Sequence, residues 1–494
     1  MNEIAKQKPS SNGRGLAEGP ASGTSLNRLS LTDAAKAVAT GETTAVALLD
    51  ACLSAIEAHE PQINATIWID RDGAHAAAVA ADRMVANGEP LGPLHGVPLA
   101  HKDMYYQAGK ISTCGSMIRK DFVPDTTATV LNRLHQAGSI TFAGLNMAEF
   151  AQNPTGHNRH HGDCHNPWNL PYITGGSSSG SGAAVAASFT YAALGSDTGG
   201  SIRLPAAACG TVGLKPTQTR ISRAGVMPLS FSCDNVGPLT RTVRDCARIM
   251  TVISGHDPAD PTSARNPVPD YEAALTGDLR GTRIGLVTNP GLMGTDAPVV
   301  AAIHAAAEVL RARGATIVPI ELPLMDAVSA YVGIVSRCEG ATIHARWMRD
   351  QPQDYAVHLS ARLYAGYAIP AVYYVEALSA RGPILKAFCQ DVFDKVDLIA
   401  LPTIPTILPT LAETDIDHGP PGTEQRFMAV SINTRPFNYL GLPAISLNAG
   451  LDPNHCPIGL QLVGRPFAEA RVMQAADAYQ RDTAWHTLTP TALT

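Results

Sequence analysis

The sequence has no pair of cysteines at CxxC spacing and no apolar run long enough to cross a membrane. Its nine cysteines are scattered, and nine cannot all pair within one chain, so we expect reduced thiols in a cytoplasmic protein. No stretch reaches ~18 uninterrupted apolar residues, and the first residues lack the apolar core of a secretory signal. Residues 1–25, rich in Ser, Gly, Lys and Asn, are therefore predicted to form a flexible tail.

Charged residues are also scarce, at 16% of the chain, and the formal net charge is only −6. This composition provides no basic stripe for a phosphate backbone and no polybasic segment for an anionic membrane. We therefore expect neither nucleic acid nor a membrane as a partner. Apolar residues make up 45% of the chain, which is enough to bury a substantial core and predicts a globular protein.

Segments of strand character alternate with segments of helical periodicity. Thr44 is a candidate helix cap, and Pro61 marks the predicted end of that helix. This alternation predicts an α/β fold, and neither an internal repeat nor a convincing linker divides the chain. Strands are predicted within residues 92–100, 139–143, 191–195, 283–287, 316–320, 398–402 and 459–463. Further helices are predicted at residues 73–87, 127–137, 183–187 and 299–313, and residues 327–389 are predicted to be mainly helical.

Two Gly/Ser clusters are separated by 24 residues, counted from Ser177 to Ser201. The first, residues 174–182, leads directly into a small-residue helix and can present free backbone N–H groups. A flexible linker is one interpretation of such a run, but this run lies between apolar segments. A phosphate-binding P-loop needs a lysine followed by Ser or Thr, and the run contains no lysine.

Four motifs follow one another along the chain: Gly96-Val97-Pro98 with Lys102-Asp103, Gly175-Gly176-Ser177-Ser178, Asp197-Thr198-Gly199-Gly200-Ser201-Ile202-Arg203, and Gly210-Thr211-Val212-Gly213-Leu214-Lys215-Pro216-Thr217. In order and spacing they resemble the amidase signature family. The match is most specific over residues 93–240 and weaker as far as residue 466. The resemblance implies one domain over residues 26–494, built on a large twisted mixed β-sheet flanked by α-helices, with a helical insertion at about 327–389.

The resemblance also implies a Ser-Ser-Lys triad. Lys102 corresponds to the catalytic lysine, Ser177 to the bridging serine that follows a cis peptide bond, and Ser201 to the nucleophile. A lysine can act as the base only when neutral, which requires its pKa to fall from ~10.4 through burial or neighbouring charges. Ser201 is then expected to attack a carbonyl while Ser177 relays its proton to Lys102. The candidate oxyanion donors are the backbone N–H groups of Thr198, Gly199, Gly200 and Ser201.

Two neighbouring groups have structural roles in this interpretation. Asp197 and Arg203 are candidates for an ion pair that stiffens the second Gly/Ser cluster, and Ser178 is expected to hold the first cluster by hydrogen bonds. A third group combines residue types that suit zinc, but its glycines and Pro167 disfavour a helix that would align them, so we predict neither metal nor cofactor. That group comprises His157, His160, His161, Cys164 and His165.

Tyr105 and Tyr106 follow the lysine motif and leave two interpretations open. They line an apolar acyl or aryl pocket near the mouth of the site, or they only pack the loop. The first interpretation predicts that aryl or hydrophobic amides, anilides and carbamates are preferred over small polar amides such as glutamine.

The function that the sequence favours is that of a stand-alone enzyme, monomeric or homodimeric, which hydrolyses a small-molecule amide with water. The alternative is the glutamine-hydrolysing A subunit of a tRNA-dependent amidotransferase. Such subunits typically carry a Gly-x-Glu-Val-Lys-Arg-Arg-like segment in the helical insertion, whereas residues 363–370 here read LYAGYAIP. A non-catalytic scaffold is disfavoured because all three residues of the implied triad are present.

Overall fold

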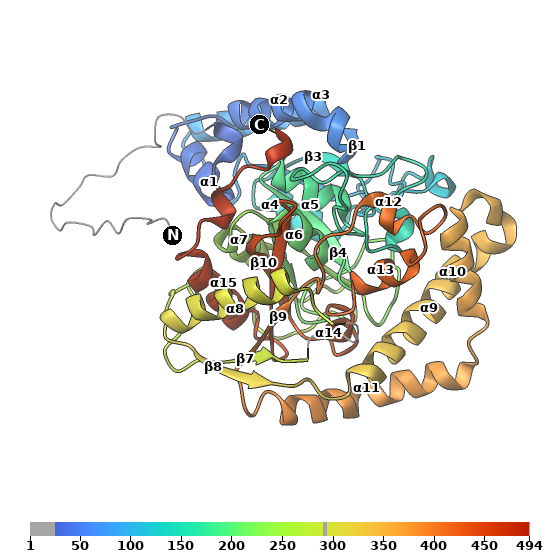
Figure 1. Cartoon of the computed structure of the whole chain (residues 1–494). Helices are drawn as coiled ribbons and strands as arrows, with labels where there is room; N and C mark the ends of the chain where they lie inside the picture. Colours follow the sequence, from blue (N-terminus) through green and yellow to red (C-terminus); the bar gives the residue numbers. More distant parts are fainter. Residues whose placement is uncertain (1–24, 290–293, 494) are drawn as a thin grey trace.

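The computed structural model describes residues 25–289 and 294–493, so the predicted tail lies outside the described residues apart from Ser25. In the described part, eleven strands form one mixed sheet in the order β1-β3-β2-β4-β6-β5-β10-β11-β9-β7-β8 (Figure 1). The expected large mixed sheet flanked by helices is therefore confirmed. The strands are β1 (Thr66–Ile69), β2 (Pro98–Lys102), β3 (Ile140–Leu145), β4 (Ala192–Asp197), β5 (Val212–Lys215), β6 (Asn235–Thr240), β7 (Arg283–Val287), β8 (Thr316–Ile320), β9 (Leu398–Pro402), β10 (Ala444–Leu451) and β11 (Pro457–Gly464).

The helices alternate with these strands over most of the chain. In the described residues they are α1 (Leu31–Ala39), α2 (Ala45–Ile63), α3 (Arg71–Ala86), α4 (Thr129–Gln136), α5 (Ser179–Ala186), α6 (Arg203–Cys209), α7 (Val243–Ile253), α8 (Ala297–Ala312), α9 (Met325–Asp350), α10 (Val357–Tyr367), α11 (Ala371–Asp391), α12 (Leu411–Thr414), α13 (Thr423–Ala429), α14 (Arg435–Tyr439) and α15 (Glu469–Gln480).

Helix α2 shows how local sequence sets these boundaries. Thr44 accepts a hydrogen bond from the backbone N–H of Ala47, which makes it the predicted N-cap. The prediction that Pro61 ends the helix is wrong by two residues. Pro61 lies in the last turn, where it removes only one backbone hydrogen bond, and the helix stops after Ile63 because Asn64 adopts a left-handed conformation with φ of 55°.

Three parallel strands near the centre of the sheet end side by side. Strand β2 runs parallel to both of its neighbours, β3 and β4, so the carboxyl ends of all three strands lie at the same edge. Helix α5 packs on this trio, and α6 packs on α5 and on β10 and β11. Ligand sites of α/β sheets form outside the carboxyl ends of parallel strands. The last residues of β2 and β4 are therefore placed to build a site.

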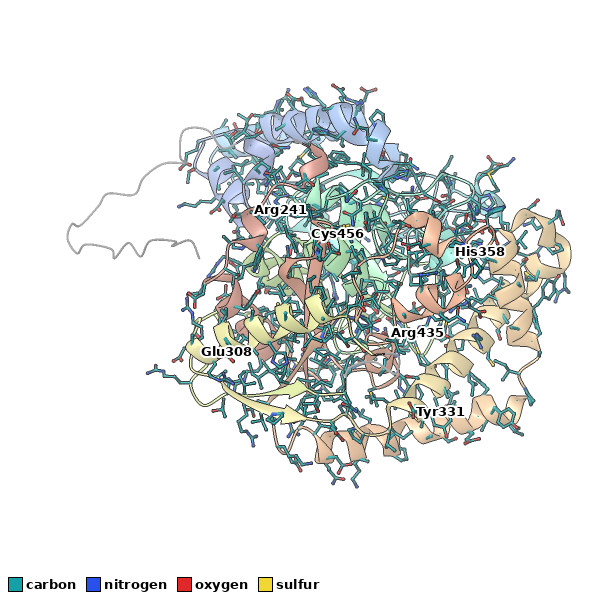
Figure 2. The ribbon with its side chains drawn as sticks, viewed as in Figure 1. Arg241, Glu308, Tyr331, His358, Arg435 and Cys456 are labelled. Carbon is teal, nitrogen blue, oxygen red and sulfur yellow. The ribbon has the colours of Figure 1, made fainter. Side chains whose placement is uncertain are left out.

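Helices α9, α10 and α11 extend along one side of the molecule, at the right and bottom of Figure 1. Helix α9 packs against α10, α11 and α14, and its apolar residues join a second buried cluster with strands β7, β9 and β11. Figure 2 shows the contrast between surface and interior: Glu308 on α8 lies at the rim, whereas the fully buried Cys456 lies near the middle of the view.

The cysteines and the helices bear on two expectations drawn from composition, reduced thiols and the lack of a membrane-spanning segment. None of the nine cysteines, all of which lie in described residues, forms a disulfide, and seven of them are buried. Within the residues described, none of the helices combines the length and the apolar character that crossing a bilayer requires.

Candidate active site

Lys102 is the last residue of β2 and is completely buried. Its Nζ donates hydrogen bonds to the hydroxyl oxygens of Ser177, at 2.7 Å, and Ser196, at 2.8 Å. Burial lowers the pKa of Lys102 to about 7, against the opposing effect of nearby carboxylates such as that of Asp197. A neutral amine is therefore accessible near neutral pH.

Ser177 reaches Lys102 from the loop that precedes α5. The peptide bond between Gly176 and Ser177 is cis, as the family resemblance implies. Ser178 holds the loop as predicted, because its hydroxyl donates to the Ser196 carbonyl and accepts from the Ser196 N–H, both at 3.3 Å. Gly175 has a φ of 69°, and a Cβ there would lie 2.7 Å from the backbone of Leu204, so only glycine fits this turn.

Ser201 lies in the loop between β4 and α6 and lines an open cleft together with Thr198 and Gly199. It is 7% exposed, and among the described residues its hydroxyl has no hydrogen-bond partner. The structure therefore joins Lys102 to Ser177 directly and leaves the Ser201 hydroxyl free on the cleft side. Catalytic hydrogen bonds are often long in unliganded enzymes and shorten only when substrate binds.

Asp197 and Arg203 form the predicted ion pair, with both side chains fully buried and two nitrogen–oxygen distances of 3.0 Å. Although burial raises the pKa of Asp197, the charge of Arg203 and several hydrogen bonds lower it to about 2. The Asp197 carboxylate also accepts the backbone N–H groups of Gly200, at 2.8 Å, and Ile202, at 3.2 Å. The pair thus fixes the path of the Ser201 loop.

This arrangement corrects one predicted oxyanion donor. The N–H of Gly200 is already donated to Asp197, so it does not face the cleft as a free donor. The N–H groups of Thr198, Gly199 and Ser201 have no hydrogen-bond partner in the described structure, and these residues line the cleft. Three of the four candidate donors therefore remain.

Tyr105 and Tyr106 do not line the cleft, which corrects the predicted apolar pocket. Tyr105 is 1% exposed and its hydroxyl donates to the Gly195 carbonyl at 2.6 Å. Tyr106 packs against Phe122 and the guanidinium of Arg119. After Lys102 the chain turns so that both rings pack against the core. The two tyrosines are therefore close to Lys102 in sequence but do not line the cleft.

His101, the residue next to Lys102, is also buried but serves no part of the site. Neighbouring residues of a strand point to opposite faces of the sheet, and His101 packs between Trp68 and Tyr105. Burial lowers its pKa to about 4. His101 is therefore neutral and lies away from Ser177.

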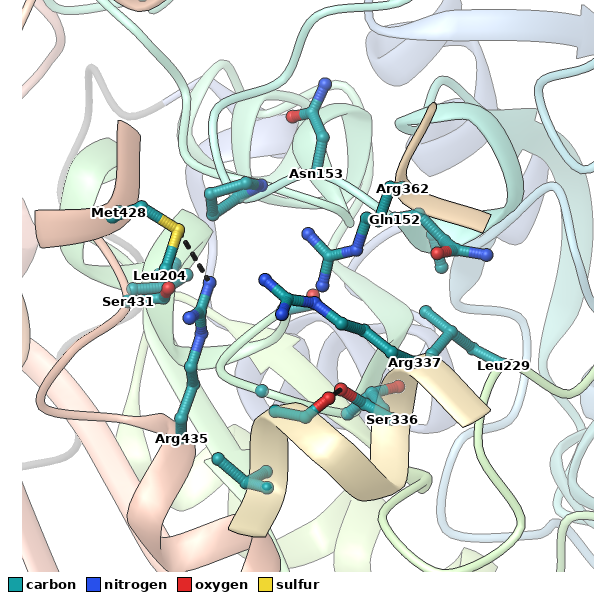
Figure 3. Close-up of a pocket in the computed structure, with 17 residues that line it drawn as sticks. Gln152, Asn153, Leu204, Leu229, Ser336, Arg337, Arg362, Met428, Ser431 and Arg435 are labelled. Atoms are coloured by element: carbon teal, nitrogen blue, oxygen red, sulfur yellow. Dashed lines mark hydrogen bonds between the residues drawn. The ribbon is translucent and has the colours of Figure 1, made fainter. Parts of the chain in front are cut away.

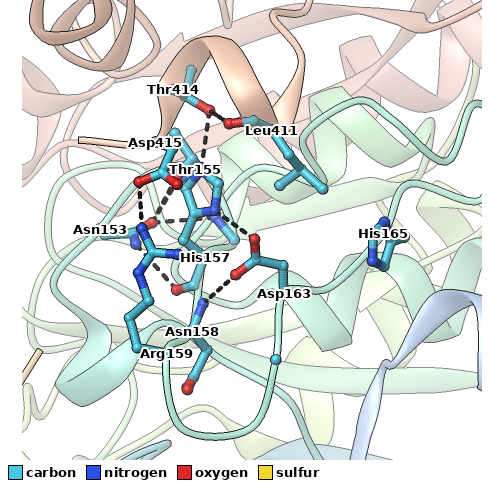
Figure 4. A network of polar contacts seen from close by, with 12 residues as sticks. Asn153, Thr155, His157, Asn158, Arg159, Asp163, His165, Leu411, Thr414 and Asp415 are labelled. Atoms are coloured by element: carbon cyan, nitrogen blue, oxygen red, sulfur yellow. Dashed lines mark hydrogen bonds and ion pairs between the residues drawn. The ribbon is translucent and has the colours of Figure 1, made fainter. Parts of the chain in front are cut away.

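The segment between His157 and His165 is a hydrogen-bonded loop (Figure 4). His157 pairs with Asp163 at 2.9 Å through Nδ1 and contacts Thr414 through Nε2, while Arg159 forms ion pairs with Asp415 and Asp417. These contacts hold the loop against the last residue of α12 and the segment that follows it. In the part of the chain that the structure describes, no three His, Cys, Asp or Glu side chains are arranged to hold a metal ion.

The cleft beside Ser201 contains a feature that sequence reasoning missed. Three arginines, Arg337, Arg362 and Arg435, line it together with neutral side chains such as Asn153 and Ser431 (Figure 3). The cavity volume of the cleft is about 70 Å³, and the cleft opens to solvent. The sequence offered one hint of a positive charge here. Arg362 directly precedes residues 363–370, the stretch compared above with the amidotransferase motif.

Comparisons with known proteins cover nearly the whole chain. The model of the amidase family matches residues 47–473. The A subunit of glutamyl-tRNA(Gln) amidotransferase from Chloroflexus aggregans is 42% identical over 490 residues, covering 94% of this chain and 99% of the relative.

Two solved structures extend the comparison. One, from work on a vestigial protein complex and the origins of an s-triazine catabolic enzyme, has a TM-score of 0.86 at 31% identity and covers 92% of this chain and 98% of its own. A bacterial aryl acylamidase of the amidase signature family has a TM-score of 0.86 at 26% identity, and the match covers 95% of this chain and 99% of the acylamidase. The chain is therefore similar to proteins of several different activities.

Proposed function

The chain belongs to the amidase signature family, and from this premise we propose that it cleaves a small-molecule amide through an acyl-enzyme on Ser201. Family membership makes it a hydrolase that acts on carbon–nitrogen bonds. The observation that supports the proposed triad best is the buried amine of Lys102, whose Nζ lies 2.7 Å from the Ser177 hydroxyl and whose pKa is lowered by burial to about 7.

The first half-reaction forms the acyl-enzyme. Ser201 Oγ attacks the amide carbonyl, its proton passes to Ser177, and the Ser177 proton passes to neutral Lys102. Negative charge develops on the former carbonyl oxygen, where the free backbone N–H groups of the Ser201 loop stabilise it. The carbon–nitrogen bond then breaks, and the leaving nitrogen takes the proton that returns from Lys102 through Ser177.

The second half-reaction uses water as the nucleophile and the same relay. Water gives its proton through Ser177 to Lys102 as it attacks the ester carbonyl of acylated Ser201. Collapse releases the carboxylic acid, and the returning proton restores the Ser201 hydroxyl. The net reaction is amide plus water giving acid plus ammonia or an amine.

Ser196 acts in this scheme as a positioning residue. Its hydroxyl accepts from Lys102 and donates to the Met104 sulfur at 3.1 Å, which leaves it no second proton to offer. A neutral Lys102 has two N–H donors and one lone pair. Donating to Ser196 turns the lone pair toward Ser177, from which the proton must come.

A second candidate is glutamine hydrolysis as the A subunit of an amidotransferase. It is favoured by the 42% identity with the Chloroflexus aggregans protein, which supports this candidate better than it supports a stand-alone aryl amidase. The aryl preference has also lost its structural basis, because Tyr105 and Tyr106 lie outside the cleft. The two candidates share the same triad and differ in what the cleft recognises.

Ammonia release from a panel of primary amides by the purified chain tests the proposal. We expect turnover of at least one amide by the wild type and loss of turnover in Ser201→Ala, with glutamine included to separate the two candidates. Turnover by Ser201→Ala at more than a tenth of the wild-type rate would overturn the assignment of the nucleophile.

A further inference from the structure

Three guanidinium groups converge on the cleft beside Ser201 from three separate elements. Arg337 lies on α9, Arg362 on α10 and Arg435 at the first position of α14. Figure 3 shows their side chains pointing toward one another across the cleft. Arg337 is exposed at the rim, whereas Arg362 and Arg435 are partly buried. The three side chains thus form one positively charged wall.

Packing fixes this convergence. A Cβ at Gly366 would lie 2.4 Å from the Arg337 carbonyl, so α9 and α10 approach closely there and bring Arg362, one turn earlier, beside Arg337. On the other side, a Cβ at Gly199 would lie 3.3 Å from Cγ of Arg435. Arg435 therefore borders the loop that carries Ser201.

These arginines have no counter-charge. In the described residues none of the three forms an ion pair, and the guanidinium of Arg435 makes a 4.0 Å contact with the Met428 sulfur. No aspartate or glutamate lines the cleft. Other buried or partly buried arginines pair with a carboxylate, as Arg203 does with Asp197, or donate to backbone carbonyls, as Arg241 does to Thr190.

The electrostatic consequence is mutual repulsion. Burial and the charges of the other two arginines lower the pKa of Arg362 to about 9, and burial and Arg337 lower that of Arg435 to about 10. Charges withdrawn from water and left unpaired are destabilising, and bound anions relieve such a cost. Arginine is also the side chain best suited to hold a planar carboxylate with two parallel hydrogen bonds.

We infer that the substrate is an amide whose acyl part carries at least one carboxylate and no ammonium group, with the carboxylate held by Arg337, Arg362 and Arg435 while its carbonyl faces Ser201. This inference rests on the proposed amide hydrolysis and specifies its substrate class. The three positive charges of the arginines exceed the single negative charge of one carboxylate.

The absence of acidic side chains from the cleft wall separates this class from free amino acids. Glutamine carries a carboxylate, which the arginines favour, and an α-ammonium, which would lie among three positive charges with no carboxylate to balance it. An anionic amide without the ammonium group avoids this repulsion.

Three amides with the same five-carbon chain test the inference. Glutaramate carries a carboxylate, pentanamide has a methyl group in its place, and glutamine adds the ammonium to glutaramate. We expect kcat/KM for glutaramate to exceed that for each of the other two at least tenfold. Pentanamide or glutamine at or above the glutaramate value would overturn the inference while leaving amide hydrolysis intact.

Variants connect the preference to the arginines. Arg362→Gln and Arg435→Gln should each lower the ratio of glutaramate to pentanamide kcat/KM at least tenfold. The matched control is Arg346→Gln on α9, an exposed arginine that pairs with Asp350 away from the cleft, and its ratio should equal that of the wild type. Unchanged ratios in both cleft variants would contradict the inference.

A binding measurement separates failure of this inference from failure of the proposed chemistry. Titration calorimetry of the full chain carrying Ser201→Ala should detect glutarate and give weaker binding, by at least tenfold, when Arg362→Gln is added. Absence of glutarate binding, or equal binding with and without Arg362, would count against the anion site even if amides are hydrolysed. Binding that depends on Arg362 in a chain that hydrolyses none of the amides would support the anion site and count against the proposed hydrolysis of small-molecule amides.

Discussion

Gly200 donates its backbone N–H to a carboxylate oxygen of Asp197 at 2.8 Å, so the glycine beside the proposed nucleophile is bound to the interior and not to the cleft. The same carboxylate pairs with the buried Arg203. The shape of the Ser201 loop therefore depends on a buried charge pair, and the proposed oxyanion donors are those N–H groups that this pair leaves free.

Replacement of Asp197 by Asn should be strongly destabilising. It would leave the buried charge of Arg203 without its partner, at a cost of about 3–5 kcal/mol in the free energy of unfolding. Urea unfolding measures this cost. Asp278→Asn, at an exposed pair with Arg280, is the control and should leave stability unchanged. Equal effects of the two substitutions would contradict a structural role for the Asp197 pair.

The pH dependence of kcat/KM should report the buried amine. In the proposed mechanism the active form of Lys102 is neutral, and burial lowers its pKa to about 7. Activity should therefore fall as the pH drops below about 7 and reach a plateau above it. The midpoint of this transition is the apparent pKa of Lys102 and Ser177 acting together. A profile that rises only near the ordinary lysine pKa of ~10.4 would contradict the lowered pKa of Lys102.

Ser196→Ala should change the rate and the pH profile together. The hydroxyl accepts a hydrogen bond from Lys102 at 2.8 Å and thereby stabilises its charged form. Without it the pKa of the amine falls, so the acidic limb should move to lower pH while kcat drops about tenfold through lost orientation. A loss of thermal stability without movement of the limb would indicate a structural role alone.

Tyr105→Phe should lower stability without changing substrate choice. The substitution removes a buried hydrogen bond to the Gly195 carbonyl, and the unsatisfied carbonyl costs about 1–3 kcal/mol in the free energy of unfolding. Tyr106→Phe is the matched control, since its hydroxyl only contacts the Met227 sulfur at 3.8 Å and should cost less. A changed ratio of anilide to aliphatic amide turnover in either variant would restore the aryl-pocket interpretation.

Much of the central sheet was predictable because its strands are continuous apolar segments. Strand β6 was not predicted, since Gly237 and Pro238 are both disfavoured in the middle of a sheet. It nevertheless lies between β4 and β5, with Pro238 opposite Leu194. Tertiary packing overrides local propensity at such a position, and a single sequence does not display that packing.

The candidate site was predictable to the extent that its residues belong to motifs. The contact between Lys102 and Ser177 spans 75 positions and follows from the family resemblance. Arg337 and Arg362 belong to none of the motifs and resemble ordinary charges on helix surfaces, whereas Arg435 lies in the weaker part of the family match. Only the packing of α9, α10 and α14 brings them together, so the cleft's charge could not be predicted.

Covalent labelling with a fluorophosphonate probe, followed by intact-protein and peptide mass spectrometry, tests the central claim most directly. The wild-type chain should gain the mass of one probe on the peptide that contains Ser201, and labelling carried out below pH 6 should be slower because Lys102 is then mostly protonated. Ser201→Ala should remain unlabelled with an unchanged unfolding temperature. A label on any other residue, or equal labelling of Ser201→Ala, would contradict the assignment of Ser201 as the nucleophile.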